Sequence, residues 1–239
     1  MVDDVSIREF GSALPDLELD FDGGSRPHLT TRVITGCTSV DETSAWKMTV
    51  GRRIELLLMV AALRAEGALA IGVRCASCGE ISEVELTIEE VLSLSSKNPA
   101  PVELDGRSIE LRHPTGADQL AWLEARPASN REATLLAVRS LIDGDWNPAA
   151  IAEIERSLDE SDPLVNFQVA AICPECGVEG RYPVDWTDFA FSKFRQAQRE
   201  QIGVVHRLAR CYHWSESEIF AVPAWRRRLY LDALDRSDA

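Results

Sequence analysis

Six cysteines occur in this sequence of 239 residues, and four of them form two matching pairs. The pairs read Cys75-Ala-Ser-Cys78-Gly79 and Cys173-Pro-Glu-Cys176-Gly177, each with a glycine directly after its second cysteine. A glycine at that point suits a tight turn, because it adopts positive φ without steric cost. Strand-like segments flank both pairs. Each pair therefore predicts a zinc knuckle, in which two thiolates lie on the turn of a hairpin.

Two knuckles supply four thiolates, which is the closed tetrahedral ligand set of a structural zinc site. We predict that Cys75, Cys78, Cys173 and Cys176 bind one structural zinc ion. An insertion of 94 residues between Cys78 and Cys173 distinguishes the chain from an ordinary zinc ribbon. The metal would join distant parts of the chain, so that its binding energy becomes folding energy.

Two alternatives to zinc remain open. The pairs can be buried cysteines without a metal, or one of them can be a redox pair of the thioredoxin type. The redox interpretation is disfavoured because neither pair opens a helix beside a βαβ pattern. Cys37 and Cys211 stand alone, and we expect Cys211 to be a small core residue of a long helix.

No other motif in the sequence carries comparable chemistry. There is no glycine-rich phosphate loop, no HExxH and no GxSxG. The four histidines are scattered, and we expect packing or surface roles for them: His28, His113, His206 and His213. Four thiolates leave no open coordination position for a substrate. The sequence therefore predicts a protein that is not an enzyme.

Charge excludes further classes of function. The chain has 25 basic and 39 acidic side chains, a net charge of −14, so we expect no nucleic-acid or membrane-surface binding. The longest apolar run has eight residues, and the acidic start is unlike a signal peptide. We expect a cytoplasmic protein without membrane insertion. Charge is also segregated: the first 28 residues are acidic, whereas residues 190–236 hold nine basic and five acidic residues.

Hydrophobic periodicity and capping signals predict an α+β fold. We expect a mainly helical body with a small antiparallel β zinc-ribbon-like core made of the two knuckle hairpins. Residues 1–30 would form an acidic, mostly irregular N-terminal arm. Residues 31–186 would form a zinc-ribbon-like α+β region with a helical and hairpin insertion between the knuckles. Residues 187–239 would form a C-terminal helical region packed on it.

Several local elements are predicted within these regions. A short strand is expected at 32–35, a central apolar helix at 50–65 ended by Gly67, and strands at 68–74 and 81–86. A hairpin should pair Val102 with Ile109 across Asp105-Gly106. Apolar residues recur at helical spacing over a long segment and predict a helix from 187 to about 213. The triplet Arg226-Arg227-Arg228 is expected on a solvated helix face, with a partner interface as the alternative because Trp214 and Trp225 are near.

Three stretches together resemble a known family. They are the helix that begins at Thr49 and leads to Ile71-Gly-Val-Arg-Cys75, the turn Arg112-His-Pro-Thr-Gly-Ala-Asp118, and the tail from Tyr212 to Leu231. The chain from about Thr49 to Leu234 is similar to the T-even-phage-type baseplate hub and hub-assembly chaperone family of contractile phage tails and contractile injection systems. The N-terminal section differs, because relatives have a longer helical segment before the first knuckle.

The resemblance implies a non-enzymatic structural or assembly protein of a baseplate. It also implies that the four paired cysteines are zinc ligands, as in the zinc-bearing members. Protein partners, in particular other baseplate components, and a multi-copy assembly follow as expectations. The alternative is a zinc-ribbon regulatory or nucleic-acid-associated protein, which the basic C-terminal helices leave open.

Overall fold

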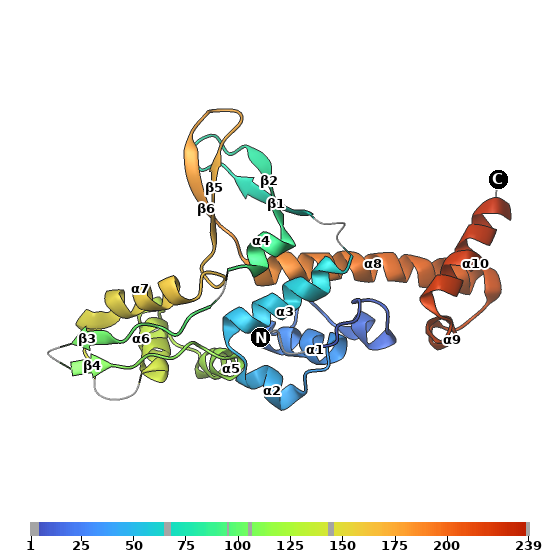
Figure 1. Ribbon diagram of the computed structural model, residues 1–239. Coiled ribbons are helices and arrows are strands. Elements are labelled where there is room, and N and C mark those ends of the chain that lie inside the picture. The colour runs from blue at the N-terminus through green and yellow to red at the C-terminus, as the bar shows by residue number, and fades with distance from the viewer. Residues whose placement is uncertain (1–4, 65–67, 95, 105–106, 143–145, 238–239) are drawn as a thin grey trace.

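The computed structural model describes residues 5–64, 68–94, 96–104, 107–142 and 146–237. The predicted turn at Asp105-Gly106 and the predicted helix end at Gly67 lie outside these residues. Three parts project from a central helical body (Figure 1). They are a pair of β-hairpins, a lobe formed by the insertion, and the outer half of a long C-terminal helix.

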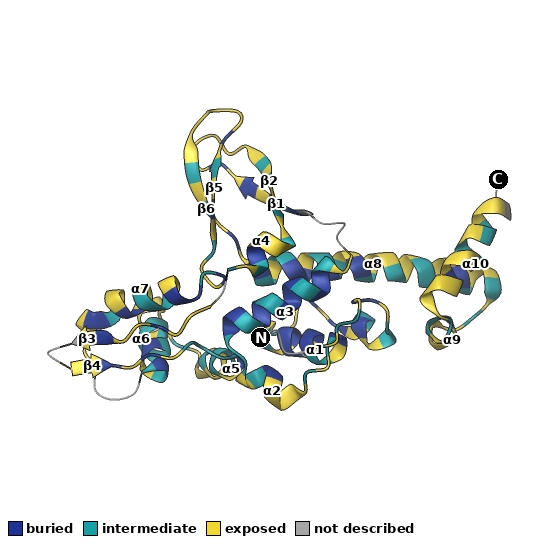
Figure 2. Cartoon of the chain, viewed as in Figure 1, coloured by how far each residue is buried: buried dark blue, intermediate teal, exposed yellow. Residues whose placement is uncertain are grey.

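The central body is built around α3 (Val50–Ala62), which the sequence predicts correctly as a core helix. The Thr49 side chain caps it by accepting a hydrogen bond from the Arg52 backbone N–H at 3.3 Å. Both faces of α3 are buried (Figure 2). One face packs with α1 (Arg26–Cys37) and the first half of α8 (Trp186–Tyr212), and the other packs beneath the hairpins. The short α2 (Glu42–Lys47) lies beside α1.

The expected strand at 32–35 is wrong, since these residues lie inside α1. β-branched residues suggested a strand, but two threonine hydroxyls in α1 donate to carbonyls of the preceding helical turn. Thr31 donates to the Pro27 carbonyl, and Thr35 donates to the Thr31 carbonyl, both at 3.0 Å. Pro27 lies in the first turn, where its fixed φ favours a helix start. Burial of Val33 and Cys37 at helical spacing outweighs the strand preference.

The N-terminal segment belongs to the core, which corrects the expectation of a separate arm. Its short 3₁₀ helix η1 (Leu14–Glu18) lies against α8, and Phe10, Leu19 and Phe21 are buried between α1, α3 and α8. The Phe10 ring lies 4.6 Å from the Phe194 ring, centroid to centroid. Apolar burial therefore holds this segment on the body although it is largely irregular.

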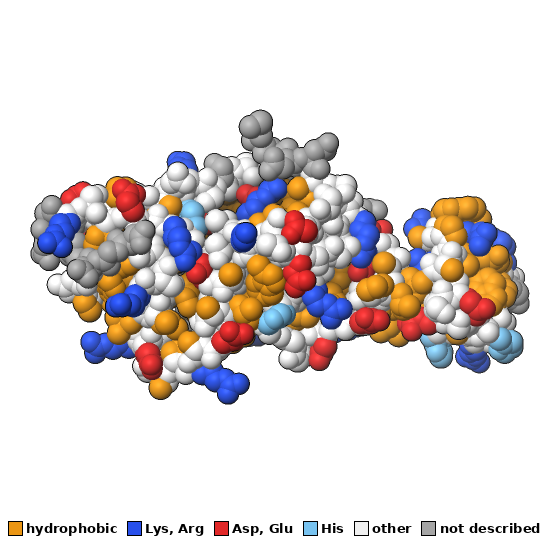
Figure 3. Space-filling view, turned by 90° about the horizontal axis from the view of Figure 1, so that it is seen from below, with side chains coloured by type: hydrophobic (Ala, Val, Ile, Leu, Met, Phe, Trp, Pro, Cys, Tyr) orange, Lys and Arg blue, Asp and Glu red, His pale blue; other side chains and the backbone are white. Residues whose placement is uncertain are grey.

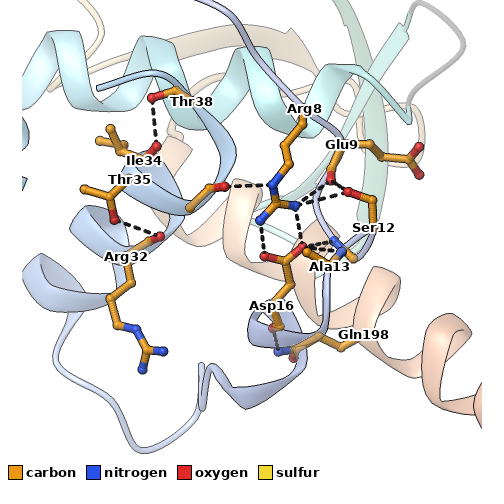
Figure 4. Close-up of polar contacts among 12 residues, drawn as sticks. Arg8, Glu9, Ser12, Ala13, Asp16, Arg32, Ile34, Thr35, Thr38 and Gln198 are labelled. Carbon is orange, nitrogen blue, oxygen red and sulfur yellow. Dashed lines mark hydrogen bonds and ion pairs between the residues drawn. The ribbon is translucent and has the colours of Figure 1, made fainter. Parts of the chain in front are cut away.

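Polar contacts fix the same segment (Figure 4). Arg8 donates two hydrogen bonds of 2.6 Å to the buried carboxylate of Asp16. That carboxylate also accepts from the Gly11 backbone N–H at 2.8 Å. Gln198 on α8 donates to the Asp16 and Leu19 carbonyls, each at 2.8 Å. The segment is thereby joined to a helix more than 170 positions later in the chain.

The insertion forms a lobe with a hydrophobic cluster of its own, which includes Val102, Ile109, Val138 and Ile154. Its hairpin pairs Val102 with Ile109 as predicted. The elements of the lobe are β3 (Val102–Leu104), β4 (Arg107–Ile109), α5 (Gly116–Ala125), α6 (Asn130–Leu141), η2 (Pro148–Ala150) and α7 (Ile151–Ser161).

The C-terminal helices depart from expectation. Only the first half of α8 packs on the body, while Ile202, which continues the apolar spacing of Phe191 and Phe194, is 54% exposed. The last helices, α9 (Glu216–Ala221) and α10 (Ala224–Ser237), lie at the outer end of α8 (Figure 1). The C-terminal region is thus not packed on the body throughout: among the described residues, the buried hydrophobic cluster that joins α8 to the body ends at Ala197. Among the described residues, none of the helices is long and apolar enough to cross a membrane.

Candidate metal centre

The two cysteine pairs lie on two hairpins with the same local geometry. β1 (Ala68–Arg74) pairs antiparallel with β2 (Ile81–Thr87), and β5 (Gln168–Ile172) pairs antiparallel with β6 (Glu179–Pro183). Helix α4 (Ile88–Leu92) follows β2 and begins with a capping box between Thr87 and Glu90. The mainly helical α+β prediction is therefore confirmed. The two hairpins form separate two-stranded sheets, and the main hydrophobic clusters involve the helices.

Each knuckle turn is closed by the same two backbone hydrogen bonds. The Cys75 N–H donates to the Glu80 carbonyl at 2.8 Å, and the Gly79 N–H donates to the Cys75 carbonyl at 2.9 Å. The corresponding bonds of the second turn join Cys173 with Val178 and Gly177 with Cys173, both at 2.9 Å. Gly79 and Gly177 have φ of +77° and +70°. A Cβ at either glycine would meet no atom within 4 Å, so the backbone conformation, not lack of space, favours glycine there.

The structure brings all four predicted ligands together. The four Sγ atoms lie within 4.8 Å of one another. Cys75 Sγ is 3.7 Å from Cys176 Sγ, and Cys78 Sγ is 3.6 Å from Cys173 Sγ. A tetrahedron of sulfurs about 2.3 Å from a central ion has edges of about 3.8 Å. The cluster is therefore compatible with one tetrahedrally bound metal ion, and the two short contacts lie between the hairpins.

Burial differs within each pair in the same way. Cys75 and Cys173, at the ends of β1 and β5, are 5% and 3% exposed, whereas Cys78 and Cys176 are exposed. Each turn thus contributes one buried thiol, from its first cysteine, and one solvent-exposed thiol at the rim of the cluster, from its second cysteine. Tyr182 on β6 lies against the cluster. Burial, and then the neighbouring Cys75 thiol, raises the pKa of its hydroxyl. The only signal for this tyrosine in the sequence is its place in a strand next to a knuckle.

Electrostatics at the cluster favour a cation. Backbone N–H groups of Cys78 and Ser77 lower the pKa of the Cys75 thiol to about 6. At Cys78 the backbone N–H of Glu80 lowers the pKa, but burial and the three neighbouring thiols outweigh it and raise the pKa to about 12. A thiolate therefore forms easily at Cys75 and with difficulty at Cys78 beside it. A divalent cation relieves this repulsion, because it replaces the protons and compensates the thiolate charge.

The unpaired cysteines lie apart from the cluster. Cys37 is buried in α1, where burial raises the pKa of its thiol to about 12. Cys211 is exposed, which corrects its prediction as a core residue. The cause is the position of Cys211 on the outer half of α8, beyond the body. Within the described residues, all six cysteines are free of disulfide bonds.

The turn from Arg112 to Asp118 joins the insertion lobe to the body. Arg112 donates to both carboxylate oxygens of Asp118 at 2.7 and 2.8 Å, and the Thr115 hydroxyl also donates to Asp118 at 2.7 Å. The Pro114 carbonyl accepts from the N–H of Val50, the first residue of α3, at 2.8 Å. This turn has a structural role in holding α5 against α3.

The same junction contains two buried charged residues that sequence reasoning missed. Arg53 on α3 is 1% exposed and donates to the Ala45 and Pro27 carbonyls, both at 2.7 Å. Asp162 is 3% exposed and lies 4.0 Å from His113 Nδ1. Burial raises the pKa of Asp162. A Cβ at Gly51 would lie 2.2 Å from an Asp162 oxygen, so this glycine provides space for a buried carboxylate. The available signal in the sequence was Gly51, a glycine in the first turn of α3.

The Asp118 contacts predict a pH dependence of stability. Partial burial raises the pKa of Asp118, but the Arg112 and Thr115 hydrogen bonds outweigh it and lower the pKa from 3.8 to about 2. A lowered pKa stabilises the fold above pH 4, and this contribution is lost as the pH falls toward 2. Because Arg112 is half exposed, we expect Asp118→Asn to cost only about 1 kcal/mol at pH 7.

Chemical denaturation of wild type and Asp118→Asn between pH 7 and pH 2 measures this effect. The difference in unfolding free energy should shrink toward zero at the acidic end. Glu124→Gln, on the exposed side of α5, is the control and should not change the unfolding free energy. A constant difference across the whole range would contradict the assignment.

Comparisons with family models, with curated proteins and with solved structures found no match for this chain. The class of site is therefore argued from its geometry alone: four free thiols at a compatible spacing, on two turns that are far apart in the sequence.

Proposed function

We propose that this chain is a non-enzymatic structural or assembly protein of the baseplate of a contractile phage tail or contractile injection system. A structural zinc ion bound by Cys75, Cys78, Cys173 and Cys176 would stabilise it. The convergence of these four cysteines carries the proposal. Four thiolates occupy every position of a tetrahedral ion, so the site suits stabilisation and leaves no position for a substrate.

The choice of zinc follows from the donor set. Four sulfur donors in tetrahedral arrangement are typical of zinc and of iron–sulfur proteins, while magnesium and calcium prefer oxygen. Each hairpin contributes one buried and one exposed cysteine, and each short sulfur–sulfur contact joins a buried cysteine of one hairpin with an exposed cysteine of the other, which favours a single ion between them. When bound, the ion would supply a cross-link between the two halves of the chain and no reaction chemistry.

The baseplate part of the proposal is supported by the resemblance of three stretches of the sequence and by the shape of the molecule. Two of the stretches, the α3–β1 segment and the Arg112–Asp118 turn, form the junction between body, hairpins and lobe. The third includes α9 and α10 at the outer end of α8. Three parts that project from one helical body would suit a protein that contacts several neighbours.

Two experiments on the native particle test this role. Mass spectrometry of purified tails or injection particles should detect the chain if it is a structural component. Absence from the particle together with failed assembly in a deletion strain would identify an assembly chaperone. Normal, functional particles in the deletion strain would refute both versions.

The basic C-terminal helices favour one second candidate, a zinc-ribbon regulatory or nucleic-acid-associated protein. Arg226 and Arg228 are exposed on α10. An electrophoretic mobility assay at low salt discriminates the two candidates, since phosphate contacts are strongest there. A salt-dependent shift would support the second candidate, and no shift at low salt would remove it.

A further inference from the structure

The outer end of α8 carries an exposed surface that combines apolar and basic side chains. Trp225 and Leu229 are 65% and 56% exposed. With Arg228 they lie at helical spacing on one face of α10. We call this set the tip face: Trp225, Arg226, Arg228 and Leu229. Hydrophobic and basic side chains gather on this end of the molecule (Figure 3).

The triplet Arg226-Arg227-Arg228 is divided between two roles. Arg227 is 5% exposed, and its guanidinium lies over the Phe220 ring at 4.7 Å. Arg226 and Arg228 point to the outside. The predicted solvent exposure is thus confirmed for Arg226 and Arg228 and is wrong for Arg227. The buried Arg227 packs α10 against α9. The tip is consequently a packed unit, with a ring cluster of Tyr212, Trp214 and Tyr230 beneath it.

The first knuckle hairpin carries a surface with two exposed carboxylates and, at its turn end opposite Ile81, Arg74, whose guanidinium donates to the Gly79 carbonyl at 2.9 Å. Ile81, Glu83 and Glu85 alternate along β2 and lie on the exposed face of the hairpin. Ile81 is 55% exposed, although it is a large apolar residue. Gly72 pairs with Glu83 on the neighbouring strand, so this face has an open position between its side chains. We call it the hairpin face: Gly72, Ile81, Glu83 and Glu85.

The two faces are complementary and cannot meet within one chain. The tip face offers two large apolar side chains and two arginines, and the hairpin face offers an isoleucine, a gap over glycine and two carboxylates. Charge along the chain is divided in the same way, because residues 190–236 are basic and the remainder holds 16 basic and 34 acidic residues. The continuous helix α8 holds the tip away from the hairpins (Figure 1).

We propose that the tip face of one copy of this chain docks on the hairpin face of a second copy. Trp225 and Leu229 would cover Ile81 and Gly72, while Arg226 and Arg228 would pair with Glu83 and Glu85. Such a contact joins different surfaces of identical chains, so each copy keeps one free tip and one free hairpin face. Contacts of this type produce rings or filaments. The proposal does not depend on the baseplate assignment.

Self-association of the full-length, metal-loaded protein is the first measurement. Analytical ultracentrifugation should show assembly beyond the dimer at low salt, weakened by added salt because exposed charge pairs are screened. Glu83→Arg/Glu85→Arg and, separately, Trp225→Ala/Arg228→Glu should each weaken association at least tenfold. Circular dichroism and metal content should match wild type, since all four side chains are exposed.

Mixing the two variants provides the decisive test. The hairpin variant keeps an intact tip, and the tip variant keeps an intact hairpin face. Their mixture should form a one-to-one dimer and nothing larger, because only one productive contact remains. A chain with both charge sets exchanged, Glu83→Arg/Glu85→Arg/Arg226→Glu/Arg228→Glu, should regain assembly. A monomeric wild type at low salt, or association that both variants leave unchanged, would overturn the proposal, as would a mixture that stays monomeric.

Discussion

Replacing Cys75 or Cys173 by serine is expected to remove the bound metal and, with it, the folded soluble protein. The apparent binding free energy of structural zinc is about 10–16 kcal/mol in small zinc domains. The stability of a whole domain is only about 5–15 kcal/mol. Loss of one buried ligand thus removes a contribution as large as the total. Both cysteines are almost completely buried at the ends of strands.

Metal analysis and soluble yield measure this prediction. Wild type should contain one zinc ion per chain, and chelation should lower its melting temperature. Cys211→Ser is the matched control, since it removes an exposed thiol far from the cluster and should retain both metal and yield. Well-folded wild type without a metal would refute the zinc assignment. Bound iron together with visible absorbance would also refute it and would identify the site as an iron–sulfur centre.

The second large effect is expected for Phe10→Ala. The Phe10 side chain is fully buried between Phe21 and Phe194, with ring centroids 5.8 and 4.6 Å away. Truncating a buried phenylalanine costs about 3–5 kcal/mol, because apolar contacts are lost and a cavity remains. The melting temperature should fall by on the order of 10 °C for a chain of this size.

Differential scanning calorimetry of metal-loaded protein measures the shift. Leu63→Ala removes a side chain that is 53% exposed at the end of α3, and it should have little effect. An N-terminal segment that acts as a loose arm would tolerate Phe10→Ala as well as Leu63→Ala. Equal melting temperatures for the two variants would therefore contradict the core position of this segment.

Local chemistry was readable in the sequence wherever neighbouring residues determine it. The Thr87 and Ser215 capping boxes, the Val102–Ile109 pairing and the two knuckle turns each depend on residues within a few positions. The cysteine spacing identified the four clustered thiols, because each knuckle turn is recognisable from neighbouring residues. Two such turns, with two thiols each, together supply one set of four ligands. The metal itself remains a prediction.

Features that depend on distant contacts were not readable. The sequence presents Phe10, Leu19 and Phe21 as scattered apolar residues among acids, and only α8 explains their burial. Likewise the apolar spacing of α8 continues past Ala197, the last α8 residue in the cluster shared with the body, although Ile202 is 54% exposed. Arg53 and Asp162 are charged residues in a core, and their burial follows from carbonyls and glycines of other segments.

The separation of the two cysteine pairs also sets an order of events during translation. Cys173 follows Cys78 by 95 positions, so the second pair leaves the ribosome on the order of ten seconds after the first. During that interval the first hairpin exposes two thiols without their partners. The insertion lobe has its own hydrophobic cluster and can collapse meanwhile. Closure of the four-cysteine cluster is thus a late step of biogenesis, and truncated products that end before Cys173 never reach it.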